Sequence, residues 1–231
     1  MISSLDNSKV KLISKLDASK QRRANQLFVV EGAHLVTEAR LAGVLVEDFS
    51  IEEKEGYTQV SESVMKKICH TDTVVKEIGL CKYLESKNIG NKILILDGVQ
   101  DPGNMGALMR SAAAFGFNTL FIGNGSVDIY NDKVIRASQG AIFKLNFHFG
   151  DSVELINRLN GYAIYGTNVI RGIALEKVVK QEKMAIILGN EGNGISNSVD
   201  ALELPNIYIP MSNTESLNVA VAGGIIMYEL R

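Results

Sequence analysis

Residues 92–116, KILILDGVQDPGNMGALMRSAAAFG, run from an apolar strand through a polar turn into a helix. Pro102 and Gly103 favour a turn, and Asn104 stands where the N-cap of the helix is expected. Arg110 follows on the same helix. A strand without polar alternation, followed at once by a helix, is typical of a parallel sheet buried on both faces. The stretch therefore predicts an α/β domain.

The same alternation continues through the rest of the chain. Strands are predicted at 119–123, 143–149, 162–168, 184–189 and 206–210, and helices at 131–141, 152–160 and 216–231. Short apolar strands that alternate with helices indicate a mostly parallel sheet covered by helices. Ligands of such sheets bind beyond the carboxyl ends of the strands, so the loops there are the candidate site.

The N-terminal part has a different pattern. Residues 3–26 are predicted to be helical, because Val10, Ile13 and Leu16 recur at helical spacing. Strands are predicted at 27–32, 44–51 and 57–60, and helices at 33–43 and 61–69. We expect a small α/β domain at 1–85, a linker at 86–92 and the larger domain at 93–231.

Composition limits the classes of protein that fit. The chain has 231 residues, 22% charged and 46% hydrophobic, with a formal net charge of −2. Such a chain is an ordinary globular protein whose surface is not basic throughout. Cys69 and Cys81 lack metal-like spacing and are expected to be reduced thiols, and no metal site is expected. Without an apolar run of membrane-spanning length or a secretory signal, we expect a cytoplasmic protein with no membrane partner.

A glycine-rich loop, GNEGNGIS at 189–196, follows the apolar stretch MAIIL. Its spacing does not suit a phosphate-binding loop, because Ile195 replaces the required lysine and Glu191 would repel phosphate. GNGSVD, which begins at Gly123, lacks the last glycine of a dinucleotide-binding fingerprint. Taken alone, the loop at 189–196 can still be a simple turn between strand and helix.

A third loop, IPMSNTESLNVAVAGG at 209–224, follows the last strand. Its Ser216 or Thr214 is expected to cap the final helix. The small residues from Ala220 to Gly224 allow two backbones to approach closely. Alone, this loop can also be no more than a capped helix start.

Together the three loops resemble the SpoU (TrmH-like) ribose 2′-O-methyltransferases of the SPOUT superfamily. The resemblance is carried by DPGNMGALMRSAAAFG, ILGNEGNGIS and IPMSNTESLNVAVA, with KVIRASQGA similar to the family's linking helix. FVVEGAHLVTEA in the N-terminal part resembles the small RNA-binding domain, similar to ribosomal protein L30e, that precedes many members acting on rRNA.

The resemblance implies a deep trefoil knot, a homodimer formed by the C-terminal domain, and S-adenosyl-L-methionine (SAM) as cofactor. The glycines of the second motif would let backbone lie against the adenosyl group. The implied cofactor contacts are Gly189, Asn190, Gly192, Gly194, Ile209, Met211 and Leu217.

The implied reaction is in-line attack of a ribose 2′-hydroxyl on the sulfonium methyl group. The implied catalytic residues are Arg110, Asn104, Glu191, Ser216 and Asn218. Arg110 would act either as the base or, since a guanidinium holds its proton strongly, as a clamp for phosphate and alkoxide. Glu191 would pair with Arg110 or hold the motif loops.

RNA is the expected partner, with rRNA favoured over tRNA. Positive charge is concentrated in residues 3–26, where Lys15, Lys20, Arg22 and Arg23 are the expected RNA contacts, alongside Lys9 and Lys11. Two other classes stay open: a non-catalytic RNA-binding protein with the same fold, and a small-molecule enzyme on a doubly wound sheet.

Overall fold

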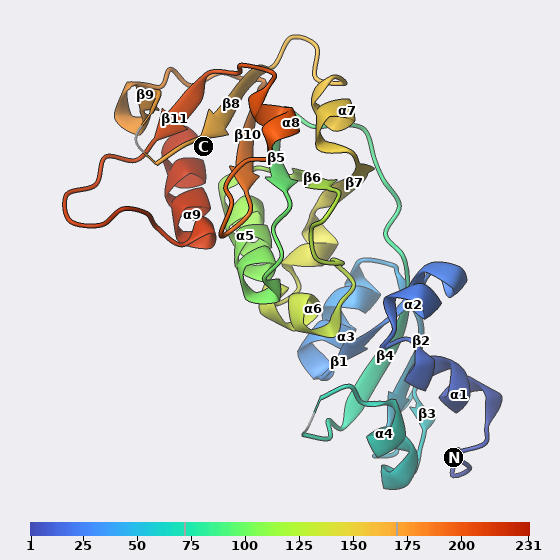
Figure 1. Cartoon of the computed structure of the whole chain (residues 1–231). Helices are drawn as coiled ribbons and strands as arrows, with labels where there is room; N and C mark the ends of the chain where they lie inside the picture. The colour runs from blue at the N-terminus through green and yellow to red at the C-terminus, as the bar shows by residue number, and fades with distance from the viewer. Residues whose placement is uncertain (72, 170) are drawn as a thin grey trace. The chain divides into compact units, whose positions relative to one another are not determined.

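The computed structural model describes residues 1–71, 73–169 and 171–231, which form two compact units (Figure 1). The first unit comprises Met1–Leu84 and Asp128–Phe143, and the second comprises Glu85–Val127 and Lys144–Arg231. The division expected from sequence, 1–85 and 93–231, is contiguous, whereas the chain returns to the first unit at 128–143.

The first unit is a four-stranded sheet with helices. Its elements are α1 (Ser8–Lys15), α2 (Ser19–Asn25), β1 (Leu27–Glu31), α3 (Ala33–Leu41), β2 (Leu45–Ser50), β3 (Thr58–Gln59), α4 (Glu62–Ile68), β4 (Glu77–Lys82) and α6 (Asp132–Ser138). The strand order is β1-β4-β2-β3, so β4 lies inside the sheet. Sequence patterns missed β4, because Gly79 interrupts its apolar run. A side chain at that position would collide with Leu45 and Val30.

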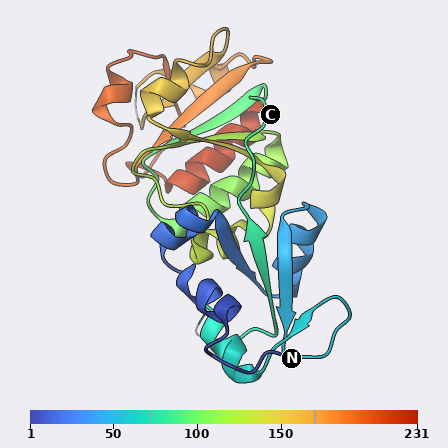
Figure 2. The ribbon, with the colours of Figure 1, turned by 90° about the vertical axis from the view of Figure 1, so that its right-hand side faces the viewer.

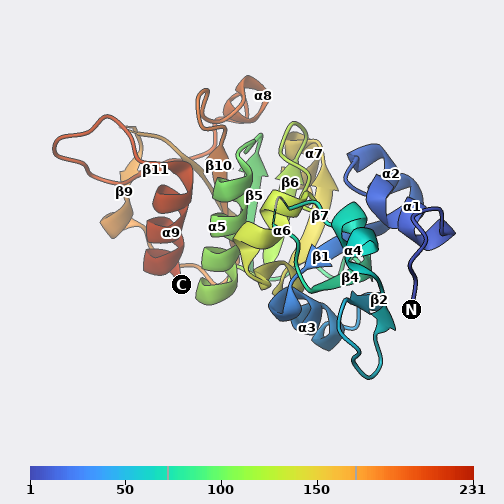
Figure 3. The same ribbon diagram turned by 90° about the horizontal axis from the view of Figure 1, so that it is seen from below.

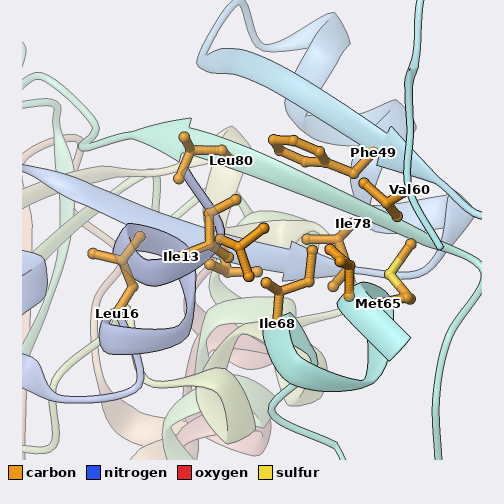
Figure 4. Packing of buried hydrophobic residues seen from close by; sticks show 11 residues of the cluster. Ile13, Leu16, Phe49, Val60, Met65, Ile68, Ile78 and Leu80 are labelled. Atoms are coloured by element: carbon orange, nitrogen blue, oxygen red, sulfur yellow. The ribbon is translucent and has the colours of Figure 1, made fainter. Parts of the chain in front are cut away.

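The prediction of one continuous helix at 3–26 is wrong, but the predicted apolar face of its first part is confirmed. The chain forms two helices, α1 and α2, separated at Leu16–Ala18. Val10, Ile13 and Leu16 are buried as expected, and they pack with Met65 and other side chains of one apolar cluster (Figure 4).

Aromatic side chains explain why residues 128–143 belong to the first unit. The ring of Phe28, which is fully buried, lies 4.8 Å from the ring of Tyr130 and 6.4 Å from that of Phe143. Tyr130 stacks on Tyr83 at 3.8 Å. The two Phe28 contacts join positions more than a hundred residues apart in sequence, which local patterns do not reveal.

The second unit is a seven-stranded sheet covered by helices, as the sequence predicted. Its elements are β5 (Lys92–Asp97), α5 (Pro102–Phe115), β6 (Thr119–Gly123), η1 (Ala141–Lys144, shared with the first unit), β7 (Asn146–Gly150), α7 (Ser152–Ile156), β8 (Ala163–Thr167), β9 (Ile173–Ala174), η2 (Leu175–Lys177), β10 (Met184–Gly189), α8 (Asn197–Asp200), β11 (Asn206–Tyr208) and α9 (Val219–Leu230). The order is β7-β6-β5-β10-β8-β11-β9, and the paired strands are parallel. From β5 the chain builds one side of the sheet and then crosses to the other, so the strand order reverses between β5 and β10.

The central strands are apolar on both faces because both are covered (Figure 3). Ile93, Ile95 and Ile187 pack in a cluster with side chains of α7 and α8. On the opposite face, α9 lies beside α5 (Figure 2). Gly223 permits this close approach, since a side chain there would meet Leu108 at 2.5 Å. Within the part of the chain that is described, no helix has the length and apolarity to cross a bilayer.

Candidate functional site

The candidate site lies where the strand order reverses. β5 and β10 are parallel neighbours that end together, with Asp97 opposite Gly189. The loops that follow these strands lead to α5 and α8, which lie on opposite faces of the sheet. This edge is where a doubly wound sheet binds its ligands.

The loop 189–196 is a compact turn closed by its own backbone. The N–H of Asn190 donates to the carbonyl of Gly194 at 2.8 Å, and the reverse bond is 2.9 Å. A side chain at 189 would collide with the backbone of Gly194 and Ile195, and Gly194 has a φ of +69°. These two glycines are therefore required by the turn itself, and contact of their backbone with the cofactor stays a prediction. A Cβ added at Gly192 would meet only Asn190 Oδ1, at 3.6 Å, so the space there is open to a ligand.

Glu191 ties this loop to the loop after β5. Its carboxylate accepts hydrogen bonds from the backbone N–H groups of Asp101 (3.0 Å) and Gln100 (3.2 Å) and from the Asn104 amide (3.1 Å). Partial burial opposes ionisation, but these hydrogen bonds outweigh it and hold the pKa of Glu191 below its ordinary value. Of the two roles left open, the contacts favour holding the loops.

Asn104 and Asn218 extend the connection to the third motif. The Asn218 amide donates to Asn104 Oδ1 at 2.9 Å. Both predicted helix caps are wrong. Asp101, not Asn104, caps α5 by accepting from the Asn104 N–H at 2.7 Å. Asn218, not Ser216 or Thr214, caps α9 through the N–H of Ala220 at 2.9 Å.

Arg110 is exposed on α5. Among residues 1–71, 73–169 and 171–231, no ion pair to its guanidinium is found. An exposed guanidinium without an acidic partner is available to an anion from solution, such as a phosphate.

The third motif forms a long loop between β11 and α9 that extends away from the helix (Figure 1). A shallow, open depression of about 640 Å³ is lined by Asn213, Thr214, Glu215 and Ser216. Ile209, Met211 and Leu217 are partly buried at the two ends of this loop. The lining offers one carboxylate and neither lysine nor arginine. That chemistry fits the cationic sulfonium and ammonium of SAM and does not fit a phosphate ligand.

The basic residues expected to bind RNA divide into two groups. Lys15, Lys20 and Arg23 are exposed. Arg22 is only 4% exposed, and its guanidinium bonds Asp128 at 2.6 Å and the Leu16 carbonyl at 2.9 Å. The prediction that Arg22 contacts RNA is therefore wrong, because its donors are used inside the first unit.

Sequence reasoning missed two acids at the site. Asp101 caps α5, and Asp97 is buried at the end of β5. The only signal for Asp97 was a single acid at the end of the apolar stretch ILILD. Over the residues the structure describes, no group of three or more His, Cys, Asp or Glu side chains is placed to hold a metal ion.

Comparison with known proteins agrees with this arrangement. Residues 91–228 match the SpoU rRNA methylase family, and residues 7–76 match the MRM3-like substrate binding domain. The chain is 32% identical over 244 residues to the 23S rRNA (guanosine(2553)-2'-O)-methyltransferase RlmP of Bacillus subtilis, covering 100% of this chain and 98% of that protein.

Solved structures give the same result. The AdoMet-bound rRNA methyltransferase from Sinorhizobium meliloti has a TM-score of 0.87 at 25% identity, covering 100% of this chain and 96% of that one. The A. aeolicus TrmH/SpoU tRNA modifying enzyme has a TM-score of 0.52 at 25% identity, covering 63% of this chain and 76% of that one. The family match includes all three motif loops and most of the second unit. This chain therefore belongs to the SpoU rRNA methylase family.

Proposed function

We propose that this protein transfers the methyl group of SAM to a ribose 2′-hydroxyl of ribosomal RNA, with 23S rRNA as the substrate. The observation that carries the proposal is the chain of side chains Glu191–Asn104–Asn218. It joins the three motif loops by hydrogen bonds of 3.1 and 2.9 Å at the sheet edge where ligands bind.

The cofactor is held by the second and third loops. The open space at Gly192 and the depression at 213–216 would take SAM, with Ile209, Met211 and Leu217 supplying apolar contact. Bound SAM supplies an electrophilic methyl group on a good leaving group. The protein therefore needs to place the hydroxyl in line and stabilise its negative charge as it reacts.

Arg110 is the residue suited to that charge. Its exposed guanidinium would grip the phosphate beside the target ribose and stabilise the developing alkoxide. Asn104 and Asn218 would orient the ribose, and Ser216 would contribute its hydroxyl from the third loop. Glu191 would hold Asn104, and through it Asn218, in position by accepting the hydrogen bond of the Asn104 amide.

The extent of the similarities supports rRNA over tRNA. Relatives described as acting on rRNA match both units of the chain. The structure described as a tRNA modifying enzyme covers 63% of it. The first unit, which resembles a substrate-binding domain, is thus shared with the rRNA group.

Mapping 2′-O-methylation across total RNA tests the function. Cells that lack the gene should lose methylation at a site in 23S rRNA, and purified protein with SAM should restore it on unmethylated ribosomal RNA. Restoration on tRNA alone would contradict the rRNA substrate. Failure to transfer methyl groups to any RNA, with RNA binding intact, would instead favour the non-catalytic alternative.

The exposed basic residues of the first unit should contribute electrostatically to RNA affinity. We expect a triple Lys15→Gln, Lys20→Gln, Arg23→Gln variant to make the slope of log affinity against log salt shallower by about two to three. The matched control is Lys66→Gln with Lys67→Gln, because these are exposed lysines of the same unit, on α4, and are not among the expected RNA contacts. Equal slopes for the triple variant and the wild type would remove these residues from the RNA surface.

A homodimer formed by the second unit belongs to the proposal. Val221, Ile225 and Tyr228 lie on one face of α9 and are 51%, 40% and 52% exposed, so a second copy would cover an apolar stripe. Ile225→Asp should reduce the mass measured by light scattering from about twice 25.2 kDa to that of one chain. A wild-type protein that is monomeric at micromolar concentration would contradict the dimer.

The family relation also supports a deep trefoil knot in the C-terminal part of the sheet. It supports a cytoplasmic location as well, because ribosomal RNA is the substrate.

A further inference from the structure

The second unit holds a buried acid that the proposed reaction does not use. Asp97 is the last residue of β5, is 6% exposed and lies opposite Gly189 of β10. One carboxyl oxygen accepts the hydroxyl of Ser152 at 2.6 Å, and the other accepts the backbone N–H of Ser196 at 2.8 Å. Its two oxygens thus link β5 to the start of α7 and to the end of the glycine-rich loop.

The loop 189–196 is hydrogen-bonded at three points to residues 97–101, the end of β5 and the turn after it. The Asn190 amide donates to the carbonyl of Gly98 at 2.9 Å near the start of the loop. Glu191 accepts from the backbone of Gln100 and Asp101 in the middle. Asp97 makes the corresponding bond at the far end, after Gly194.

Glycine-rich backbone loses more conformational entropy on ordering than any other, so such a loop needs fixed anchors. Without Asp97, the Ser196 N–H would lose its partner, and the segment between Glu191 and α8 would have no bond to β5. That segment contains Gly192, where the space for a ligand is open.

We propose that Asp97 is a positioning residue that holds the end of loop 189–196 in the conformation that binds SAM. It acts through the Ser196 N–H and touches neither the cofactor nor the RNA. The inference rests on the proposed function, because it assigns that loop to the cofactor.

The test uses the full-length protein and two pairs of variants. Asp97→Ala removes both hydrogen bonds, whereas Asp97→Asn keeps an oxygen for Ser196 and an amide for Ser152. Ser196→Pro removes the backbone N–H of residue 196 and no other backbone donor. The φ of Ser196, −64°, suits proline. Ser196→Ala loses only the hydroxyl, which makes no capping bond.

Two measurements separate positioning from general damage: SAM affinity by calorimetry, and hydrogen exchange of residues 190–196 without SAM. We expect Asp97→Ala and Ser196→Pro to weaken SAM binding by about 10- to 100-fold and to speed exchange in the loop. Asp97→Asn should stay within about three-fold of wild type, since a neutral acceptor still serves Ser196. Ser196→Ala should bind SAM at least about ten-fold more tightly than Ser196→Pro.

Three results would overturn the proposal. The first is a folded Asp97→Ala protein with wild-type SAM affinity and loop exchange. The second is an Asp97→Asn protein as weak as Asp97→Ala, which would mean that the charge acts on the cofactor directly. The third is equal affinity for Ser196→Pro and Ser196→Ala. A wild-type protein that does not bind SAM would refute the proposed function instead.

Discussion

Arg110→Ala is expected to lower the single-turnover rate of methyl transfer on the order of 10³-fold, close to complete loss in a steady-state assay. Arg110 is exposed on α5, so its removal leaves the packing of α5 against α9 unchanged. SAM affinity, the dimer and the thermal midpoint should therefore remain near those of the wild type. A folded Arg110→Ala protein with near-normal rates would remove this residue from the site.

Arg110→Lys separates the two roles open to this side chain. Lysine keeps the positive charge but loses the planar fork that grips phosphate and oxyanion at two points. If Arg110 is a clamp, lysine should keep partial activity, on the order of 10²-fold below wild type. If Arg110 is the base, the more easily deprotonated lysine should give a rate that rises with pH. Single-turnover rates of the wild type and both variants between about pH 6 and 10 decide between these roles.

Glu191→Gln is expected to weaken SAM binding by about ten-fold and to slow methyl transfer on the order of 10²-fold. A glutamine places an amide beside the backbone N–H groups of Gln100 or Asp101, both of which need an acceptor. The Asn104 amide then loses its fixed acceptor, and the Asn104 side chain, which accepts from Asn218, is held less rigidly. Glu176→Gln is the matched control, because Glu176 is an exposed acid of the same unit outside the site.

The lowered pKa of Glu191 also predicts a pH effect of known sign. Its ionised form is favoured by the folded state, so its contribution to stability is present above the unfolded pKa of about 4.3. That contribution is lost as the pH falls through the lower folded value. The stability difference between wild type and Glu191→Gln should therefore shrink in acid. A difference that grows below about pH 4 would contradict the contacts described for Glu191.

Elements with strong local patterns were predicted closely. The strands at 119–123 and 184–189 were placed correctly to the residue, because each is a continuous apolar run bounded by polar or glycine residues. The helix predicted at 104–116 was recognised from its small and apolar residues, but it begins at Pro102, so Pro102 and Gly103 are its first residues and not the expected turn. The three motif loops were identified because their unusual residues follow the ends of three strands, β5, β10 and β11, and a parallel sheet brings such ends to one edge.

The errors fall where distant residues compete for the same local role. Asn104 and Ser216 are acceptable caps in isolation, but the helices begin at Pro102 and Val219, so Asp101 and Asn218 are the caps. The Asn104 side chain instead bonds the distant Glu191 and Asn218. Arg22 was predicted to be an exposed cation, but it is buried in an ion pair with Asp128, which is far along the chain.

The amino-acid pattern was sufficient for the sheet class, the order of most strands and helices, and the loops that carry the chemistry. All of these depend on residues close together in the chain. Contacts between distant segments decided the rest: the interior strand β4, the return of residues 128–143 to the first unit, and the anchoring of loop 189–196 by Asp97 and Glu191. Such contacts depend on packing and hydrogen bonding in three dimensions, so periodicity along the chain does not predict them.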